Sequence, residues 1–242
     1  MSEKNKATIA VRSGVEADKH HGAVVAPIYL STTYSFADFD TKRQYDYGRS
    51  GNPNRDILAE TLAELEGGVR GIITATGMSA VHLATQILNH DDTLVIPHDC
   101  YGGSYRLFTS LEKRGLLKLE VVDFTKSDSL TRILAIKPKL IWIETPSNPI
   151  LRLTDIKAVT DTAKQCGALV AADNTFLSPA LQNPIKFGAD IVVHSTTKYI
   201  NGHSDVVGGA VIAATAELGE ELAWWANNIG ITGAPFDSYL TL

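Results

Sequence analysis

A single lysine stands where a buried strand should end, in a cluster of small hydroxyl side chains. The apolar run at 189–195 is followed directly by Thr196, Thr197 and Lys198. An ammonium at the edge of a hydrophobic core is costly unless the charge is paired or used chemically. Lys198 is therefore either a surface lysine in a loop or a reactive amine, and the rest of the sequence must decide between the two.

Other polar side chains also stand at the ends of apolar runs. Asp173 ends the run at 168–173, where it could cap the next turn or be the partner of a buried cation. The junction at 76–80 offers backbone N–H groups and a helix dipole, a natural seat for a phosphate, although an ordinary capped helix start has the same sequence. Ser195 and Thr197 could donate hydroxyl hydrogen bonds to the same phosphate.

One cofactor requires all of these groups together. Pyridoxal phosphate needs an amine for a Schiff base, an acid at its pyridine nitrogen, a phosphate cradle and an aromatic ring that stacks on its own. Lys198 and Asp173 would be the amine and the acid. Tyr101, in a glycine-rich turn, could stack on the cofactor, although an exposed loop tyrosine would look the same. No group is specific alone, but their order at successive strand ends favours pyridoxal phosphate.

Several other familiar sites are missing from the sequence. Neither G-x-G-x-x-G nor G-x-x-x-x-G-K-[ST] follows an apolar run, which disfavours the usual nucleotide sites. The run TGMSAV nearly matches the hydrolase elbow G-x-S-x-G, but Val81 replaces its last glycine. The seven histidines show no zinc spacing, and Cys100 and Cys166 suit neither a disulfide framework nor a metal cluster. No metal is expected.

The elements that must position these residues alternate between apolar and amphipathic runs. Continuous apolar strands separated by helices predict an α/β fold, with a mostly parallel seven-stranded sheet and helices on both faces. The carboxyl ends of such strands would bring the polar residues to one crevice. The expected strands lie at 71–76, 93–99, 117–123, 139–145, 168–174, 189–195 and 206–214.

Length and charge narrow the class of protein. The chain has 242 residues and a net charge of −5 at pH 7, so it can bury a large core and has no basic surface for nucleic acid or anionic membrane. No run reaches membrane-spanning length, and the N-terminus lacks the apolar segment of a signal peptide. We expect a cytoplasmic enzyme or binding protein. The first 50 or so residues have few helical patterns and are interpreted as an arm that lies on a partner.

In these motifs the chain resembles the Cys/Met-metabolism family of pyridoxal-phosphate enzymes, which have the aspartate-aminotransferase fold. The family segment SATKYxxGHxD is matched by STTKYINGHSD at 195–205. The segments YDYGRSGNPNRD, TATGMSA, HDCYGGSY, ETPSNP and VAADNTF follow the family order and spacing, and the resemblance extends from about Ala7 to the last residue.

The resemblance implies a role for a set of residues. Lys198 is similar to the Schiff-base lysine that later carries protons, Asp173 to the partner of the pyridine nitrogen, and Tyr101 to the stacking ring that assists exchange of amines on the cofactor. A lysine of lowered pKa is needed to remove a substrate proton, and a dry, cation-flanked site would supply it. The other implied residues are the phosphate cradle Gly77, Met78, Ser195 and Thr197, the pair Tyr47 and Arg49 that would reach the phosphate of the neighbouring subunit, and Asn148 and Arg106 facing the substrate.

An assembly is also implied. Residues 1–53 would be an arm contacting the neighbouring subunit, and residues 54–242 the cofactor-binding large domain of a homotetramer with sites shared across dimers. The small C-terminal domain of the family, with the arginine that binds the substrate carboxylate, is expected to be absent.

The reaction implied is γ-replacement on an amino-acid substrate. O-Succinylhomoserine and cysteine would give cystathionine and succinate, a step of transsulfuration in methionine biosynthesis. The alternatives are a lyase that cleaves cystathionine or another C–S bond, a homoserine sulfhydrylase of the same family, and an inactive cofactor-binding fragment.

Overall fold

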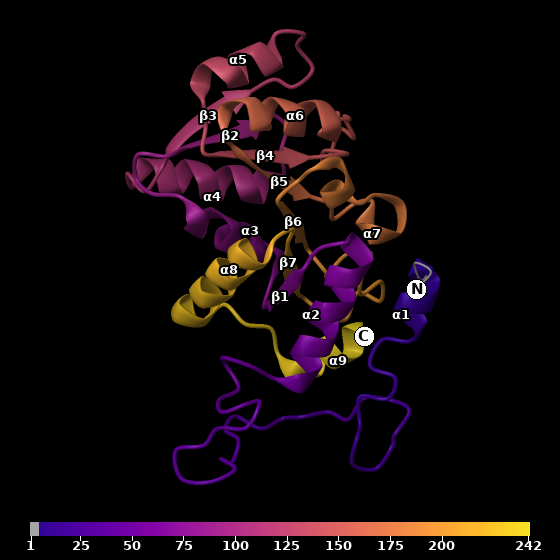
Figure 1. The fold of residues 1–242 in the computed structure, drawn as a ribbon. Helices are drawn as coiled ribbons and strands as arrows, with labels where there is room; N and C mark the ends of the chain where they lie inside the picture. Colours follow the sequence, from indigo (N-terminus) through magenta and orange to yellow (C-terminus); the bar gives the residue numbers. More distant parts are fainter. Residues whose placement is uncertain (1–4) are drawn as a thin grey trace.

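Seven strands form one sheet at the centre of the molecule (Figure 1). The structure, a computed structural model, describes residues 5–242. In this part of the chain β7 runs antiparallel to both of its neighbours, and the other adjacent pairs are parallel, so the predicted mostly parallel sheet is confirmed. The order across the sheet is β1 (Arg70–Thr74), β7 (Gly209–Ala213), β6 (Ile191–His194), β5 (Leu169–Asp173), β4 (Leu140–Glu144), β2 (Thr93–Pro97) and β3 (Lys118–Val122).

Helices cover both faces of this sheet, which explains why its central strands are apolar throughout. One face packs against α3 (Gly77–Ala84), α4 (Gly102–Lys113) and α8 (Ala216–Ile229). The other face packs against α5 (Ser129–Ile136) and α6 (Ile156–Cys166) at one end. At the other end it packs against α2 (Pro53–Glu66). Every residue of β4 is buried, as expected for a strand with helices on both sides.

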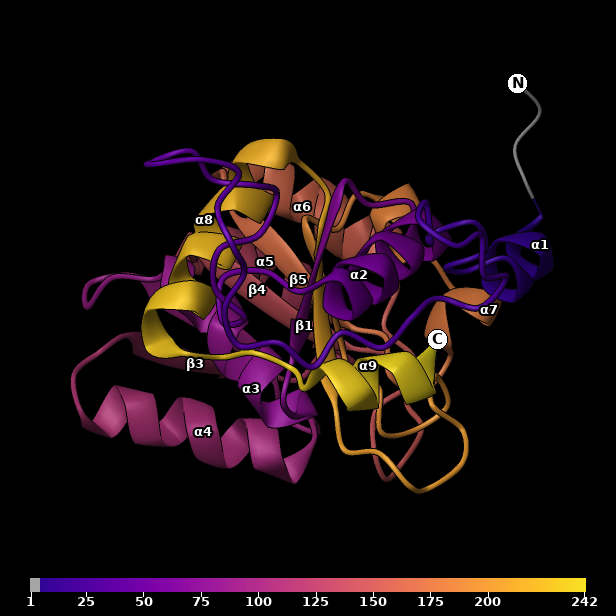
Figure 2. The ribbon, with the colours of Figure 1, turned by 90° about the horizontal axis from the view of Figure 1, so that it is seen from below.

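The remaining helices are short. Helix α9 (Pro235–Thr241) lies alongside α2 in both views (Figure 1 and Figure 2). The others are α1 (Lys6–Val11), α7 (Ser178–Leu181) and the 3₁₀ turns η1 (Thr85–Ile87) and η2 (Pro184–Phe187). Within residues 5–242, no helix has both the length and the apolar character required to cross a membrane.

The stretch between α1 and α2 is irregular and lies at one end of the molecule (Figure 1). It has only isolated bridges, Thr33 with Tyr47 and Asp38 with Thr41. Large apolar side chains on it are exposed, among them Phe39, which is 95% exposed. An exposed apolar surface of this kind is typical of a segment that binds another surface. That this segment is an arm on a neighbouring subunit stays a prediction.

Candidate active site

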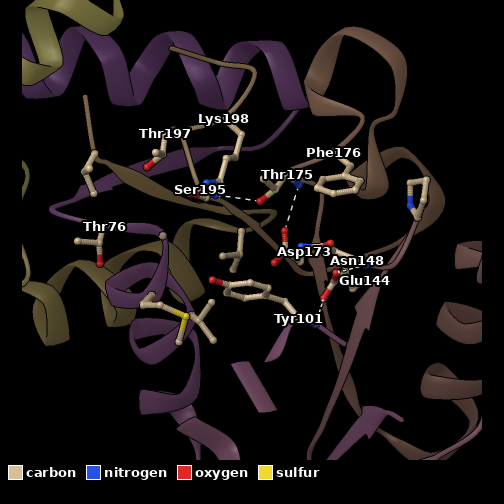
Figure 3. A pocket seen from close by; sticks show the side chains of 16 residues that line it. Thr76, Tyr101, Glu144, Asn148, Asp173, Thr175, Phe176, Ser195, Thr197 and Lys198 are labelled. Atoms are coloured by element: carbon tan, nitrogen blue, oxygen red, sulfur yellow. Dashed lines mark hydrogen bonds between the residues drawn. The ribbon is translucent and has the colours of Figure 1, made fainter. Parts of the chain in front are cut away.

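A cavity of about 450 Å³ lies at the carboxyl ends of β4, β5 and β6, against the start of α3 and Tyr101 before α4 (Figure 3). Open α/β sheets bind their ligands in this crevice. Side chains from widely separated parts of the sequence therefore meet here. The predicted site residues that line it are Gly77, Met78, Tyr101, Asn148, Asp173, Ser195, Thr197 and Lys198.

The acid at the floor of the cavity is Asp173, the last residue of β5. Its Oδ1 accepts the N–H of Thr175 at 3.1 Å. Burial raises the pKa of the Asp173 carboxyl, while the hydrogen bonds from Thr175 and the charge of His194 act in the opposite direction. A carboxylate in this setting is stabilised by a cationic donor, and a protonated ring nitrogen is such a donor.

Lys198 follows β6 and points into the same cavity as Asp173 (Figure 3). Its backbone N–H donates to the carbonyl of Ser195 at 3.2 Å, so the two residues belong to one tight turn. The side chain is nevertheless exposed. The expectation of a buried lysine is therefore wrong for this chain by itself, because the turn lies at the open mouth of the cavity and not in its floor.

The start of α3, where a phosphate cradle is predicted, lies against the cavity. The first hydrogen bonds at the N-terminus of α3 are donated by the Ala80 N–H to the Thr76 carbonyl at 3.1 Å and by the Ser79 N–H to the Thr76 hydroxyl at 2.9 Å. The N–H groups of Gly77 and Met78 precede these bonds and face the cavity end of the helix.

Glycine is required at the first position of α3 because a second chain segment approaches it closely. A Cβ at Gly77 would lie 2.6 Å from the Cβ of Ser195, which also lines the cavity. The hydroxyl of Thr197, in contrast, already donates to the Gly208 carbonyl at 3.1 Å and accepts the Gly208 N–H at 3.0 Å. Thr197 lies at the predicted place, but its donor would have to turn from Gly208 to reach a phosphate.

Tyr101 precedes α4, and its ring lies in the cavity (Figure 3). The ring is packed closely against the first turn of α4, since a Cβ at Gly103 would lie 2.5 Å from Tyr101 Cε1, and Met78 Sδ of α3 would lie 2.9 Å from the same Cβ. One face of an aromatic ring in this position can stack on a flat ligand.

Glu144, the last residue of β4, was not predicted as a site residue. Its Oε2 accepts the N–H of Tyr101 at 2.6 Å and its Oε1 the N–H of Asn148 at 2.8 Å. Glu144 lies opposite Asp173 in the register of β4 and β5. Burial first, and then the charge of Asp173, raise the pKa of Glu144 to about 8. The available signal was its place at the end of the strand within ETPSNP, next to the strand of Asp173.

Thr175 and Phe176 were also missed, although both stand in the motif DNTF. The hydroxyl of Thr175 accepts the N–H of Ser195 at 2.9 Å, while its own N–H binds Asp173. Thr175 thus joins the ends of β5 and β6, which carry the acid and the turn with Lys198. The ring of Phe176 lines the cavity.

Three predicted residues lie elsewhere. The guanidinium of Arg49 stands 5.4 Å from the ring centre of Tyr47, and its Nε donates to Asn227 Oδ1 at 3.2 Å. Arg106 is exposed on α4. None of the three lines the cavity of its own chain. Contribution of Tyr47 and Arg49 to a neighbouring subunit, and of Arg106 to substrate binding, stays a prediction.

The residues in the cavity fit pyridoxal phosphate. Lys198 offers an amine, Asp173 a half-buried acid, and Tyr101 a ring that can stack on a flat ligand. The free N–H groups at the start of α3 suit a phosphate, and Gly77 leaves the room that a Cβ would fill.

Comparison with known proteins gives the same result. The family model of Cys/Met metabolism PLP-dependent enzymes matches residues 7–242. The cystathionine gamma-synthase of Escherichia coli (strain K12) is 57% identical over 240 residues, which are 99% of this chain and 62% of that protein. The cystathionine beta-lyase of Coxiella burnetii (strain RSA 493 / Nine Mile phase I) is 40% identical over 97% of this chain and 61% of its own length.

A solved structure agrees in fold as well as in sequence. The cystathionine gamma synthase of Xanthomonas oryzae pv. oryzae, in complex with aminoacrylate and cysteine, has a TM-score of 0.97 and 60% identity. The match covers 98% of this chain and 62% of that one, so the chain spans less than two thirds of these relatives. The chain belongs to the family of Cys/Met metabolism PLP-dependent enzymes.

Proposed function

We propose that the chain forms the cofactor-binding part of an enzyme that carries out γ-replacement on O-succinylhomoserine with cysteine. The observation that carries the proposal is the meeting of Lys198, Asp173 and Tyr101 in one cavity. The choice of reaction is supported by the identity of 57% to a cystathionine gamma-synthase. The bond from the γ-carbon to oxygen breaks and succinate leaves, and the thiolate of cysteine forms the new C–S bond of cystathionine.

Pyridoxal phosphate, when bound, supplies an aldehyde that condenses with amines and a ring that accepts electrons. Asp173 would hold a negative charge at the ring nitrogen, and its burial strengthens that interaction because little water screens it. The ring of Tyr101 would fix the plane of the cofactor from one side. The N–H groups of Gly77 and Met78, with the hydroxyl of Ser195, would hold the phosphate.

Proton movement is assigned to the Nζ of Lys198. As a free amine, Nζ would take the proton from the α-carbon, and after releasing that proton it would take one from the β-carbon. Glu144 holds the backbone of Tyr101 and Asn148, which both line the cavity. Asn148 would face the substrate, and the side chain of Glu144 would fix its place.

The assembly and domain division are part of the proposal. Residues 54–242 are assigned to the cofactor-binding domain, and residues 1–53 to an arm that lies over a neighbouring subunit. Tyr47 and Arg49 would then reach the neighbour's phosphate, which is consistent with their place outside the cavity of their own chain. We expect a cytoplasmic homotetramer.

Reduction with borohydride tests the role of Lys198. After incubation with pyridoxal phosphate and reduction, peptide mass mapping should find the pyridoxyl group on the peptide that contains Lys198. Lys198→Arg keeps the positive charge but lacks a nucleophilic amine, and should remove the label. The exposed Lys113 of α4 is the internal control. Labelling spread equally over Lys113 and Lys198 would contradict the proposal.

A lyase is the second candidate, favoured by the identity of 40% to a cystathionine beta-lyase. The two reactions are separated by supplying O-succinylhomoserine with cysteine in one sample and cystathionine alone in another. Formation of cystathionine in the first sample supports γ-replacement. Loss of cystathionine with release of ammonia in the second, and no product in the first, supports the lyase. Cofactor bound at Lys198 with no turnover in either would assign the chain a binding role only.

A further inference from the structure

A second buried polar cluster lies behind the cavity, on the opposite face of the sheet. Its centre is Glu66, the last residue of α2, which has no exposed surface. Oε1 of Glu66 accepts hydrogen bonds from Asn174 Nδ2 and His194 Nε2, both at 2.7 Å, and Oε2 accepts one from Asn183 Nδ2 at 3.2 Å. Together with Gln182, these residues are called the Glu66 cluster below.

Two members of the cluster are sequence neighbours of site residues. Asn174 directly follows Asp173, and His194 directly precedes Ser195. Successive side chains at the end of a strand point to opposite faces of the sheet. Asp173 and Ser195 therefore face the cavity, while Asn174 and His194 face Glu66.

Gln182 extends the same network to the third strand end. Its Nε2 donates to Asn174 Oδ1 and to the carbonyl of Thr145, both at 2.9 Å. Thr145 directly follows Glu144. The Glu66 cluster thus contacts the chain next to the site residue at the end of each of β4, β5 and β6.

The ring of His194 depends on Glu66 for its orientation. The residue is fully buried, and its Nδ1 finds no hydrogen-bond partner within residues 5–242. The bond from Nε2 to Glu66 is therefore the polar contact that fixes the ring. Because a carboxylate only accepts, Nε2 carries the proton in this pair.

A buried carboxylate is a costly way to hold a helix against a sheet, since apolar side chains of similar volume often do so at lower cost. What a carboxylate adds is direction, because each donor must stand at one place for its hydrogen bond to form. Here two of the three donors, Asn174 and His194, stand at the ends of strands.

We propose that Glu66 is a positioning residue for the cofactor site, which acts through Asn174 and His194 to fix the backbone that carries Asp173 and Ser195. The inference rests on the proposed binding of pyridoxal phosphate in the cavity. Its consequence is that the acid for the ring nitrogen and the phosphate cradle keep a constant separation. The N–H of Asn174, which donates to the Val193 carbonyl at 3.0 Å, belongs to the same fixed backbone.

Glu66→Met tests the proposal with a side chain of similar length that has no acceptor oxygen. A glutamine could keep its one oxygen at the place of Oε1, which accepts from both Asn174 and His194, whereas a methionine leaves both of these donors without their acceptor. We expect the dissociation constant for pyridoxal phosphate, measured by titration of the cofactor's absorbance, to rise about tenfold, which corresponds to about 1.4 kcal/mol.

Two control variants separate positioning from a loss of stability. Asn183→Ala removes the donor on Oε2, which is not adjacent to a site residue, and should lower stability while changing the affinity by less than about twofold. Glu60→Gln, exposed on the same helix, should change neither. If Asn183→Ala weakens cofactor binding as much as Glu66→Met does, Glu66 has only a structural role and the proposal is overturned.

Amide hydrogen exchange of the cofactor-free chain gives a second readout. In Glu66→Met the amides of Asn174 and Ser195 should exchange at least about tenfold faster relative to Trp142 in the core of β4, because opening of this backbone no longer costs the hydrogen bonds to Glu66. In Asn183→Ala their rates relative to Trp142 should stay unchanged. Unchanged relative rates in Glu66→Met would overturn the proposal.

A pair of His194 variants applies if Glu66→Met does not fold. His194→Gln keeps a donor near the place of Nε2 and should keep the affinity, whereas His194→Met fills the space without a donor and should lose it. Equal affinities in the two would overturn the proposal. Failure of the unsubstituted chain to bind pyridoxal phosphate would instead contradict the proposed function, and the exchange rates would still decide the role of Glu66.

Discussion

Glu144→Gln is expected to make the stability of the cofactor-free chain less dependent on pH between 4.5 and about 8. The side chain ends β4 opposite Asp173 and accepts two backbone N–H groups. Burial and the charge of Asp173 raise the pKa of Glu144 from 4.5 to about 8. A glutamine of the same shape does not titrate, so the substitution removes this contribution and leaves the packing in place.

The sign follows from the number of protons bound. In the folded chain Glu144 keeps its proton up to about pH 8, whereas in the unfolded chain it loses the proton near pH 4.5. The folded state binds more protons in this interval, so the free energy of unfolding falls as the pH rises through it. At about 1.4 kcal/mol per pKa unit, the fall amounts to at most about 5 kcal/mol.

Glu144→Gln avoids this fall in stability with pH, but it also loses a hydrogen bond, which lowers its stability at every pH. In Glu144→Gln the NH₂ group must face the N–H of either Tyr101 or Asn148, and leaving a buried donor without an acceptor costs about 1–3 kcal/mol. The variant should therefore be less stable than the unsubstituted chain near pH 4.5 and more stable, by about 2 kcal/mol or more, near pH 8. The two curves should cross at about pH 6.

Urea unfolding followed by circular dichroism, repeated at pH values from about 5 to about 8, gives the two curves. Glu221→Gln, on the exposed side of α8, is the matched control and should run parallel to the unsubstituted chain. A Glu144→Gln curve that stays below the unsubstituted one by a constant amount would refute the reasoning, because Glu144 would then be ionised throughout.

Two glycine substitutions test the walls of the cavity. Gly77→Ala should weaken the binding of pyridoxal phosphate by at least about tenfold in an absorbance titration, since the added Cβ would lie 2.6 Å from Ser195 Cβ and part the phosphate cradle. Gly103→Ala should shift the absorbance spectrum of the bound cofactor, because its Cβ would lie 2.5 Å from Cε1 of Tyr101 and displace the ring. Gly102→Ala, whose Cβ would meet only the end of a flexible arginine at 3.6 Å, is the control for both. An equal effect of all three substitutions would mean that the cavity wall is not the cause.

The residues at the strand ends could be predicted because they depend on local pattern. A run such as 168–173 is apolar throughout and stops at a carboxylate, and strands of a parallel sheet end at the same edge. The sequence alone therefore predicts that Asp173, Tyr101 and the turn with Lys198 lie in one crevice. The sheet and the cavity confirm that placement.

The partners of these residues could not be predicted, because they depend on register and on contacts between distant segments. Glu144 faces Asp173 only through the alignment of β4 with β5. Glu66 is separated from Asn174 by 108 positions and from His194 by 128. No periodicity in the sequence marks such pairs. The exposure of Lys198 was missed for a related reason, since the apolar run before it says nothing about what covers the turn after it.

The site therefore has two parts that differ in how they are held. The floor, with the half-buried Asp173 and the buried Glu144, is held by the pairing of β4 with β5 within the sheet and by the Glu66 cluster on the face away from the cavity. The mouth, with Lys198, is exposed in the single chain. The charge of an acid attracts a bound cation strongly only where water is excluded, and an amine that exchanges partners needs room to move. Firmly held acids at the bottom of the cavity and an exposed Lys198 at its opening meet these two requirements, provided that a second surface covers the lysine when substrate is bound. The exposed apolar stretch at 24–39 is the segment of this chain with the composition for such a surface, which is why we assign it to a neighbouring copy.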